Sequence, residues 1–412
     1  MENRIRVNAD RLHQSLAQLG QIGATAGGGV TRLALSDEDR VARDLLAGWM
    51  RDAGLAVRID DFGNMTGRRA GTEDRAAIVA ASHIDSVRAG GLFDGAYGVL
   101  AALEVIRTLN DQSLTTRCPI EVVNWTNEEG VRFEPAMLCS GAVAGRFDRS
   151  YVYDRTDRDG VRFEDELRRI GYLGDATARP DPAAYLELHI EQGPVLEAEG
   201  VPVGIVPGIV GITWLDVRLT GRADHAGPSP MPLRHDALAA AARLITGVET
   251  IARQTKEAVG TVGRLTLEPN VINTIPGRVT MSVDFRHPDS ATLDALVASF
   301  GCLAAETWAS TGVEIAIDRF WTSDPTTFDD DLLAAIQSTC EGLDLPHRRL
   351  WSRAGHDAKY VQDLAPAAMI FVRSRDGLSH CEQEYSTPAD LEAGANVLLQ
   401  TLLRLAGTAD PS

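Results

Sequence analysis

Short apolar runs alternate along the chain with longer stretches in which apolar residues recur at helical spacing. Ser36 and the two acidic residues after it predict the start of a helix in which Val41, Leu45 and Trp49 recur, and Gly54 ends it. Four apolar runs lack polar alternation, which is typical of strands buried in a mostly parallel sheet. These runs are 76–81, 119–125, 184–190 and 366–372. The pattern predicts an α/β fold.

The stretch from 212 to 320 has a different order of elements. It predicts β-α-β-β-α-β, the ferredoxin-like arrangement of a small α+β domain, with elements at 213–220, 234–254, 259–268, 279–286, 291–309 and 313–319. Gly- and Pro-rich segments flank it. We therefore expect residues 1–208 and 325–412 to form one split domain, with a mostly parallel sheet and helices on both faces, and residues 209–324 to form an inserted domain.

Composition and charge narrow the function classes. The chain of 412 residues is 44% hydrophobic and 24% charged, which is typical of globular proteins. Its 40 basic and 58 acidic residues give a net charge of −18, which disfavours nucleic acid and anionic membranes as partners. The five cysteines include no C-x-x-C pair, which argues against disulfides and thiolate zinc sites. With no signal peptide and no run long enough to span a membrane, we expect a cytoplasmic protein.

Polar residues follow the predicted strands where chemistry is expected. Sites in open parallel sheets form at the carboxyl ends of the strands. In chain order, the four runs lead to His83, to Glu128 and Glu129, to His189, and to His380. Such nitrogen and oxygen donors, without a thiolate, suit Zn²⁺, Mn²⁺, Co²⁺ or Ni²⁺.

Three acidic residues complete the predicted site. Asp94 is placed to bridge two metal ions. Glu128 is the spare carboxylate beside them, placed to take a proton from water. Asp85, two residues after His83, is expected to hydrogen-bond a ligand imidazole.

Each of these residues also has a structural alternative. His83 alone would suit a satisfied core histidine, and Asp94 would suit the N-cap of the helix that follows it. Glu128 and Glu129 would suit a solvated pair, and His380 an ordinary loop residue. These alternatives weaken together, because adjacent carboxylates near buried strands are costly without a compensating cation.

The chain resembles the N-carbamoyl-L-amino-acid hydrolase group, which includes β-ureidopropionase and allantoate amidohydrolase, within the dinuclear-metal aminoacylase and carboxypeptidase superfamily. The resemblance covers about residues 36–390 and is carried, in order, by SHIDSVRAGGLFDGAYGVLAALE, NEEGVRF, LELHIEQGPVLE, GRADHAGPSPM, AGHDA and LSHCEQEYS.

The resemblance implies roles for particular residues. It implies two divalent metal ions, one held by His83, Asp94 and His189 and the other by Asp94, Glu129 and His380, with Glu128 as general base. It also implies that the inserted domain serves as a lid and in dimerisation, and that His225 reaches the active site of the partner in a homodimer. The implied substrate contacts are Gln192, His225, Asn273, Arg286 and His356.

Four of the implied substrate contacts also have alternative roles. Alternation along 279–286 buries every second side chain and places Arg286 on the other face, where an ion pair with Asp284 is the alternative role. Asn273 precedes a Pro-Gly turn and would suit a turn residue. His356 opens a helix and would suit a neighbour of its cap, whereas the residues around His225 alone favour neither reading.

With the predicted metal site, the resemblance implies hydrolysis of an N-carbamoyl-L-amino acid to the amino acid, ammonia and carbon dioxide, by metal-activated water with Glu128 as base. The alternatives on the same site are allantoate, a β-ureido acid or an acyl amino acid as substrate. A noncatalytic amino-acid-binding relative is a remote alternative, because a binding protein has no use for Glu128.

Overall fold

The computed structural model describes residues 5–409, which form two compact units. Unit 1 combines the described residues up to Pro207 with those from Phe328 onward, and unit 2 is Gly208–Thr327. Each unit has its own hydrophobic core. The strands that enter and leave unit 2, β7 (Gly208–Ile209) and β15 (Thr326–Thr327), pair with one another in antiparallel register.

The core of unit 1 is an eight-stranded mixed sheet. Its four central strands are parallel neighbours, and they are the four strands predicted from the apolar runs. Nearly all of their residues are buried, as expected for strands covered on both faces. In spatial order the strands are β1 (Ala56–Ile59), β2 (Met65–Arg69), β4 (Ile120–Trp125), β3 (Ala77–His83), β5 (Pro182–Ile190), β17 (Ala367–Val372), β6 (Val203–Val206) and β16 (His347–Arg349).

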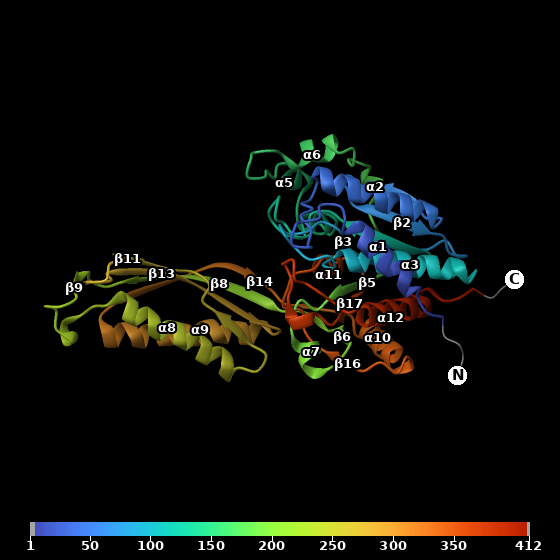
Figure 1. Ribbon diagram of the computed structural model, residues 1–412. Helices are drawn as coiled ribbons and strands as arrows, with labels where there is room; N and C mark the ends of the chain where they lie inside the picture. Colours follow the sequence, from blue (N-terminus) through green and yellow to red (C-terminus); the bar gives the residue numbers. More distant parts are fainter. Residues whose placement is uncertain (1–4, 410–412) are drawn as a thin grey trace. The chain divides into compact units, whose positions relative to one another are not determined.

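Helices cover both faces of this sheet. Helix α12 (Pro388–Ala406) places Gly394 against the side chain of Leu188, whereas Ala358, which begins α11 (Ala358–Val361), donates to the carboxylate of Glu187. Successive strand residues point to opposite faces, so α12 and α11 lie on opposite sides of β5. Helix α3 (Ala96–Asp111) packs against α12 (Figure 1). The predicted α/β fold, with a mostly parallel sheet and helices on both faces, is confirmed.

The remaining helices of unit 1 are short or lie around this core. Across residues 5–409 the structure contains no helix that combines the length and apolar character needed to cross a membrane. The α-helices are α1 (Ala9–Leu19), α2 (Asp37–Asp52), α4 (Leu138–Val143), α5 (Arg149–Tyr153), α6 (Phe163–Arg169), α7 (Val195–Glu199) and α10 (Asp330–Gly342), and the 3-10 helices are η1 (Ala176–Ala178) and η3 (Arg375–Gly377).

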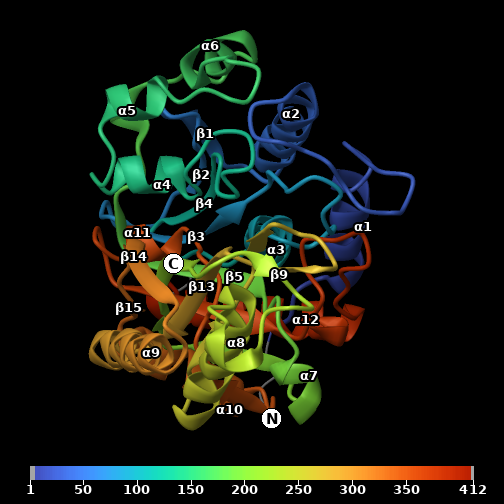
Figure 2. The same cartoon turned by 90° about the vertical axis from the view of Figure 1, so that its left-hand side faces the viewer.

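Unit 2 has the β-α-β-β-α-β order expected from the sequence, with its second strand divided into β10 and β11. The sheet order is β10-β13-β8-β14, and β11 also pairs with β13. Helices α8 and α9 lie side by side (Figure 2). The main elements are β8 (Gly211–Thr220), α8 (Ala237–Gln254), β10 (Val259–Thr261), β11 (Leu265–Glu268), β13 (Arg278–His287), α9 (Ser290–Thr311) and β14 (Glu314–Ser323); β9 (Asp224–His225) pairs with β12 (Thr274–Ile275), and η2 is Met231–Leu233.

Helix α2 begins and ends as predicted, but it buries a different face. The Ser36 side chain accepts a hydrogen bond from the main-chain N–H of Asp39, and Gly54 follows the helix with φ +80°. The stripe of Val41, Leu45 and Trp49 does not form the buried face, since Val41 is 46% exposed. The buried residues are instead Asp39, Ala42, Arg43, Leu46, Ala47 and Met50. The reason is a charged pair that faces inward.

That pair is Asp39 and Arg43, whose side chains are both 0% exposed. Arg43 Nε donates to Asp39 Oδ2 over 2.8 Å, and its other nitrogens donate to the carbonyl oxygen of Gly63 and the hydroxyl of Thr126. Asp39 Oδ2 also accepts from the main-chain N–H of Leu35, so both charged groups have polar partners, whereas Asp39 Oδ1 has none within residues 5–409. The pair also connects α2 to the residue that follows β4, two positions before Glu128.

We predict that Arg43→Ala lowers the free energy of unfolding by about 3–5 kcal/mol, because Asp39 is left buried without its cation. Chemical denaturation followed by circular dichroism measures the loss. Arg40→Ala, at an exposed position of the same helix, is the control and should change stability by less than about 0.5 kcal/mol. Equal stability of the two variants would show that the buried pair contributes little.

Candidate metal centre

Histidine and carboxylate side chains from separate segments of unit 1 converge beyond the central strands. Two groups have potential ligand atoms within 4.8 Å of one another. The first group is His83, Asp94 and His189, and the second is Asp94, Glu129 and His380. Asp94 belongs to both groups. The structure therefore brings together all five residues that the sequence analysis proposed as metal ligands.

Asp94 contacts three imidazoles. Its Oδ1 lies 3.1 Å from His189 Nε2 and 3.7 Å from His83 Nε2, and its Oδ2 lies 3.3 Å from His380 Nε2. The alternative that Asp94 caps α3 is wrong, because Gly95 is the N-cap residue. Gly95 has φ +60°, and a Cβ at this position would overlap the ring of His83. Glycine therefore allows the loop to approach the imidazole closely.

In two of these imidazoles, the nitrogen that faces away from Asp94 contacts a main-chain oxygen. His83 Nδ1 lies 3.0 Å from the carbonyl oxygen of Asp85, and His189 Nδ1 lies 2.9 Å from that of Ile190. Hydrogen bonds of this kind fix the ring orientation of histidine ligands. They leave the Nε2 atoms directed at Asp94.

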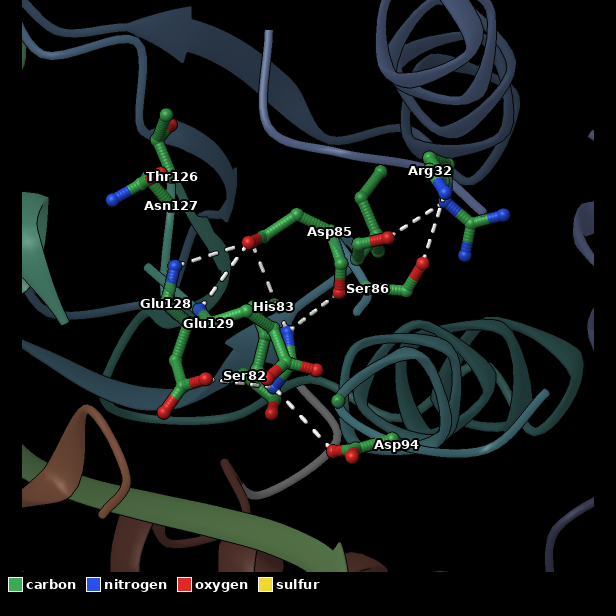
Figure 3. A network of polar contacts seen from close by, with 12 residues as sticks. Arg32, Ser82, His83, Asp85, Ser86, Asp94, Thr126, Asn127, Glu128 and Glu129 are labelled. Carbon is green, nitrogen blue, oxygen red and sulfur yellow. Dashed lines mark hydrogen bonds and ion pairs between the residues drawn. The ribbon is translucent and has the colours of Figure 1, made fainter. Parts of the chain in front are cut away.

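The carboxylate of Asp85 has a different partner from the one predicted. It lies 3.8 Å from His83 Nδ1, which is too long for a hydrogen bond. Instead it accepts from the main-chain N–H groups of Glu128 and Glu129, at 3.2 and 3.3 Å (Figure 3). Asp85 thus holds the main chain of the glutamate pair, and only its carbonyl oxygen holds the imidazole.

Glu128 and Glu129 are buried, so the alternative of a solvated pair is wrong. Glu128 is 7% exposed, and its Oε2 lies 3.5 Å from His83 Nε2. The Glu129 side chain is 5% exposed, and its Oε2 lies 3.4 Å from His380 Nε2. The preceding Asn127 has φ +58° and donates to the carbonyl oxygen of Phe133, which stabilises the sharp turn that presents both glutamates.

The electrostatics of the site favour a bound cation. Burial, with neighbouring carboxylates, raises the pKa of Glu128 and of Glu129 well above the usual range. Burial also raises the pKa of Asp94, but hydrogen bonds with His189 and His380 outweigh it, and the net pKa is well below the usual value. Burial lowers the pKa of His83 to about 4, so this imidazole is neutral near pH 7 and available as a ligand.

An unpartnered carboxylate oxygen also favours a bound cation at this site. Glu129 Oε1 is buried and has no hydrogen-bond partner within the described part of the chain. A buried carboxylate oxygen without a partner is costly, and a divalent cation would satisfy it. The donors are imidazole nitrogens and carboxylate oxygens, so the residues present fit Zn²⁺, Mn²⁺, Co²⁺ or Ni²⁺.

Gln192 lies beside the shared carboxylate. Its Nε2 donates to Asp94 Oδ2 over 2.9 Å and to the Ser379 hydroxyl over 3.2 Å. Its Oε1 is buried and, among residues 5–409, lacks a hydrogen-bond partner. A substrate contact was expected for Gln192, whereas Ser379 and Glu384, which contact the same region, were not predicted from the sequence.

A second polar cluster lies near His189 and was also missed. Glu187 accepts from the hydroxyls of Ser82 and Tyr185 and from the main-chain N–H of Ala358. The signal that would have found it is a glutamate inside an otherwise apolar strand, because a buried carboxylate needs partners. Asp357 is likewise buried and accepts from the Ser140 hydroxyl.

His356 lies in this cluster. Its ring centroid is 4.5 Å from that of His189, and its Nε2 lies 3.0 Å from the Ser352 hydroxyl. Its main-chain oxygen accepts from Lys359 at the start of α11, so the position next to a cap is observed. His356 therefore packs directly against one of the five candidate ligands.

The three candidate residues of unit 2 lie at two different places in that unit. His225 is exposed in β9 and pairs with Thr274, and the carbonyl oxygen of the neighbouring Asn273 accepts from Ala226. Arg286 lies near the other end of β13, opposite Ile212. β13 begins at Arg278, near β12, and the eight steps along the strand from Arg278 to Arg286 correspond to about 27 Å.

Arg286 also forms the ion pair that was its alternative role. Its guanidinium lies 2.8 Å from the carboxylate of Asp284, and both side chains are partly exposed, at 31% and 25%. The alternation that predicted this face is observed, since Val279, Met281, Val283 and Phe285 are buried.

Comparisons with known proteins identify the family of the chain. Residues 79–404 match the family model described as peptidase family M20/M25/M40. An N-carbamoyl-L-amino-acid amidohydrolase from Rhizobium meliloti is 43% identical over 408 residues, which cover 98% of each chain. An allantoate amidohydrolase from Bacillus subtilis is 37% identical over 395 residues, covering 94% of this chain and 95% of the relative.

Solved structures of the same group are similar to this chain over nearly its whole length. The crystal structure of an amidase of the hydantoinase/carbamoylase family from Burkholderia multivorans is 47% identical, with a TM-score of 0.96 and coverage of 98% of both chains. The resemblance seen in the sequence motifs is thus confirmed. The chain belongs to peptidase family M20/M25/M40 and, within it, to the amidohydrolase group that includes the N-carbamoyl-L-amino-acid and allantoate amidohydrolases.

Proposed function

We propose that the protein hydrolyses an N-carbamoyl-L-amino acid to the free amino acid, ammonia and carbon dioxide. The observation that carries the proposal is the pair of three-residue donor groups sharing Asp94, with the buried Glu128 beside them. Relatives named N-carbamoyl-L-amino-acid amidohydrolase cover nearly the whole chain and support this substrate class.

In this proposal two divalent ions, Zn²⁺, Mn²⁺, Co²⁺ or Ni²⁺, are held by the two groups. His83, Asp94 and His189 would hold one ion, and Asp94, Glu129 and His380 the other. Such ions polarise a carbonyl group and lower the pKa of water. That chemistry suits a ureido carbonyl, which is a poor electrophile because two nitrogens donate into it.

Glu128 is the proposed general base. Its carboxylate is next to the first donor group, and Asp85 fixes its main chain through the N–H hydrogen bond. Its burial among other carboxylates favours taking up a proton, as general base catalysis requires. Glu128 would accept the proton of the attacking water and pass it to the leaving nitrogen.

Gln192 is proposed to orient the substrate. Its Nε2 is committed to Asp94 and Ser379, which leaves Oε1 as a buried acceptor. The terminal NH2 of a carbamoyl group would donate to this oxygen, whereas the carbon that replaces it in an acyl group offers no such donor. This difference supports ureido compounds over acyl amino acids as substrates.

The positions of the unit 2 residues support a shared active site in a homodimer. Asn273 precedes β12, near the end of β13 where Arg278 lies, whereas Arg286 lies near the opposite end, which disfavours contact of both with the same small carboxylate. We therefore propose that Arg286 acts with its own chain, while His225 and Asn273 come from the partner. Unit 2 would then serve as both lid and dimerisation unit.

We also propose a cytoplasmic location. The five cysteines are all unpaired, which suits a reducing compartment.

We predict ammonia release from N-carbamoyl-L-amino acids in an assay supplemented separately with Mn²⁺, Co²⁺, Ni²⁺ or Zn²⁺. Allantoate, a β-ureido acid and an N-acyl amino acid are assayed in parallel, with product formation as the common readout. The highest kcat/KM is expected for a carbamoyl amino acid. A higher value for allantoate would move the assignment to that substrate, and no turnover of any compound would favour a binding protein.

Substitutions of the two adjacent glutamates should have different effects on metal content and on catalysis. Glu128→Gln should retain metal but lose the base, so kcat should fall by about 10²–10⁴-fold with little change in KM. Glu129→Gln should instead lower the metal content, because a proposed ligand is removed. Elemental analysis and steady-state kinetics on the same preparations measure both effects. Metal loss in Glu128→Gln with normal metal content in Glu129→Gln would reverse the two assignments.

Mixed dimers test whether the site is shared. Glu128→Gln and His225→Ala should each be nearly inactive alone. After both are denatured and refolded together, half of the dimers should be mixed, and each should have one whole site. Activity should recover to about one quarter of wild type, as two-fold geometry requires. A mixture that is not allowed to exchange subunits is the control. Mixed dimers without recovery would place His225 in the site of its own chain or outside catalysis.

A further inference from the structure

Glu384 is a buried carboxylate in contact with the loop that carries Asp94. It is 5% exposed and lies four residues after His380 in the segment that follows β17. Its Oε1 accepts from the main-chain N–H groups of Phe93 and Asp94, over 3.0 and 3.1 Å. One side-chain oxygen therefore fixes the main chain of the residue that both donor groups share.

The other oxygen of Glu384 contacts the hydroxyl of Ser379. The Ser379 Oγ lies 2.8 Å from Glu384 Oε2 and 3.3 Å from Asp94 Oδ2, and it accepts from Gln192 Nε2. A hydroxyl has one proton to donate, and the shorter contact is with Glu384. Glu384 thus orients Ser379, which lies between the Asp94 carboxylate and the Gln192 amide.

The two loops approach each other closely at Gly91. A Cβ at Gly91 would overlap the side chain of Glu384, so only glycine leaves room for it. The contact joins residues 91–94 to residues 379–384, segments that are nearly 300 positions apart in the sequence. One segment carries Asp94 and the other carries His380.

We propose that Glu384 is a positioning residue that sets Asp94 and His380 at the spacing needed to hold a metal ion together. It acts through hydrogen bonds to main-chain N–H groups and to Ser379, without touching the metal. This inference rests on the proposed metal binding by the second donor group, Asp94, Glu129 and His380. Three donors, the N–H groups of Phe93 and Asp94 and the hydroxyl of Ser379, bind the two oxygens of Glu384. We therefore expect the position of these oxygens to matter more than the negative charge of Glu384.

Two substitutions separate geometry from charge. Glu384→Gln removes the charge but keeps the contacts, since the amide oxygen can accept from Phe93 and Asp94 and the amide nitrogen can donate to Ser379. Glu384→Asp keeps the charge but withdraws the carboxylate by one methylene, so it cannot reach both loops. Gln383→Ala, at the exposed neighbouring position, is the control for changes in the same segment.

The experiment is a Co²⁺ titration of the metal-free, full-length protein, followed by visible absorbance. The wild type should take up two equivalents. In Glu384→Asp the affinity for one equivalent should fall by about 10–100-fold, as is typical when a residue supporting metal ligands is changed, and the other should be affected less. Glu384→Gln and Gln383→Ala should remain close to wild type.

Several results would overturn the assignment. Wild-type affinity in Glu384→Asp would show that the contacts do not position the ligands. A loss in Glu384→Gln as large as that in Glu384→Asp would show that charge is what matters. Equal weakening of both equivalents would show that Glu384 acts only through the shared Asp94 and does not set the spacing between Asp94 and His380. A wild-type protein that binds no Co²⁺ would overturn the proposed metal centre itself, and this inference with it.

Discussion

The contact of Asp94 with three imidazoles is the constraint on which the centre of unit 1 depends. The imidazoles come from β3, from β5 and from the segment after β17, so two neighbouring strands and a distant loop must meet at one carboxylate. Two more carboxylates, Glu128 and Glu129, are buried beside it. Burying three carboxylates close together is unfavourable unless a cation compensates their negative charge. The loop glycines, Gly91 and Gly95, are needed because the convergence leaves no space for a Cβ.

Much of this convergence was predictable from sequence, for a physical reason. Uninterrupted apolar runs predict parallel strands, and parallel strands deliver the residues at their carboxyl ends to one edge of the sheet. His83 and His189 stand at such ends, so their proximity follows from the strand pattern alone. For Asp94 and the glutamate pair, the structural alternatives required helix capping or solvent exposure that the fold does not provide.

What could not be predicted depends on hydrogen bonds to the main chain and on charges paired inside the core. Helical spacing identified α2 but not its buried face, because Arg43 and Asp39 are charged residue types that form an ion pair inside the core. Residue type suggested that Asp85 would bond an imidazole, whereas its carboxylate bonds two N–H groups made available by the turn at Asn127. Glu384 gave no signal, since its main-chain partners lie in a segment remote in the sequence.

The length of the unit 2 sheet limits which residues of one chain can contact the same substrate. A ten-residue antiparallel strand is a rigid spacer, and in β13 it separates Arg286 from the His225 and Asn273 end. No hinge between the two units can bring these groups together, because the separation lies inside one unit. If all three contact one small substrate, two copies of the chain must contribute them. The need for a second subunit would then follow from strand geometry, independently of how large or how apolar the subunit interface is.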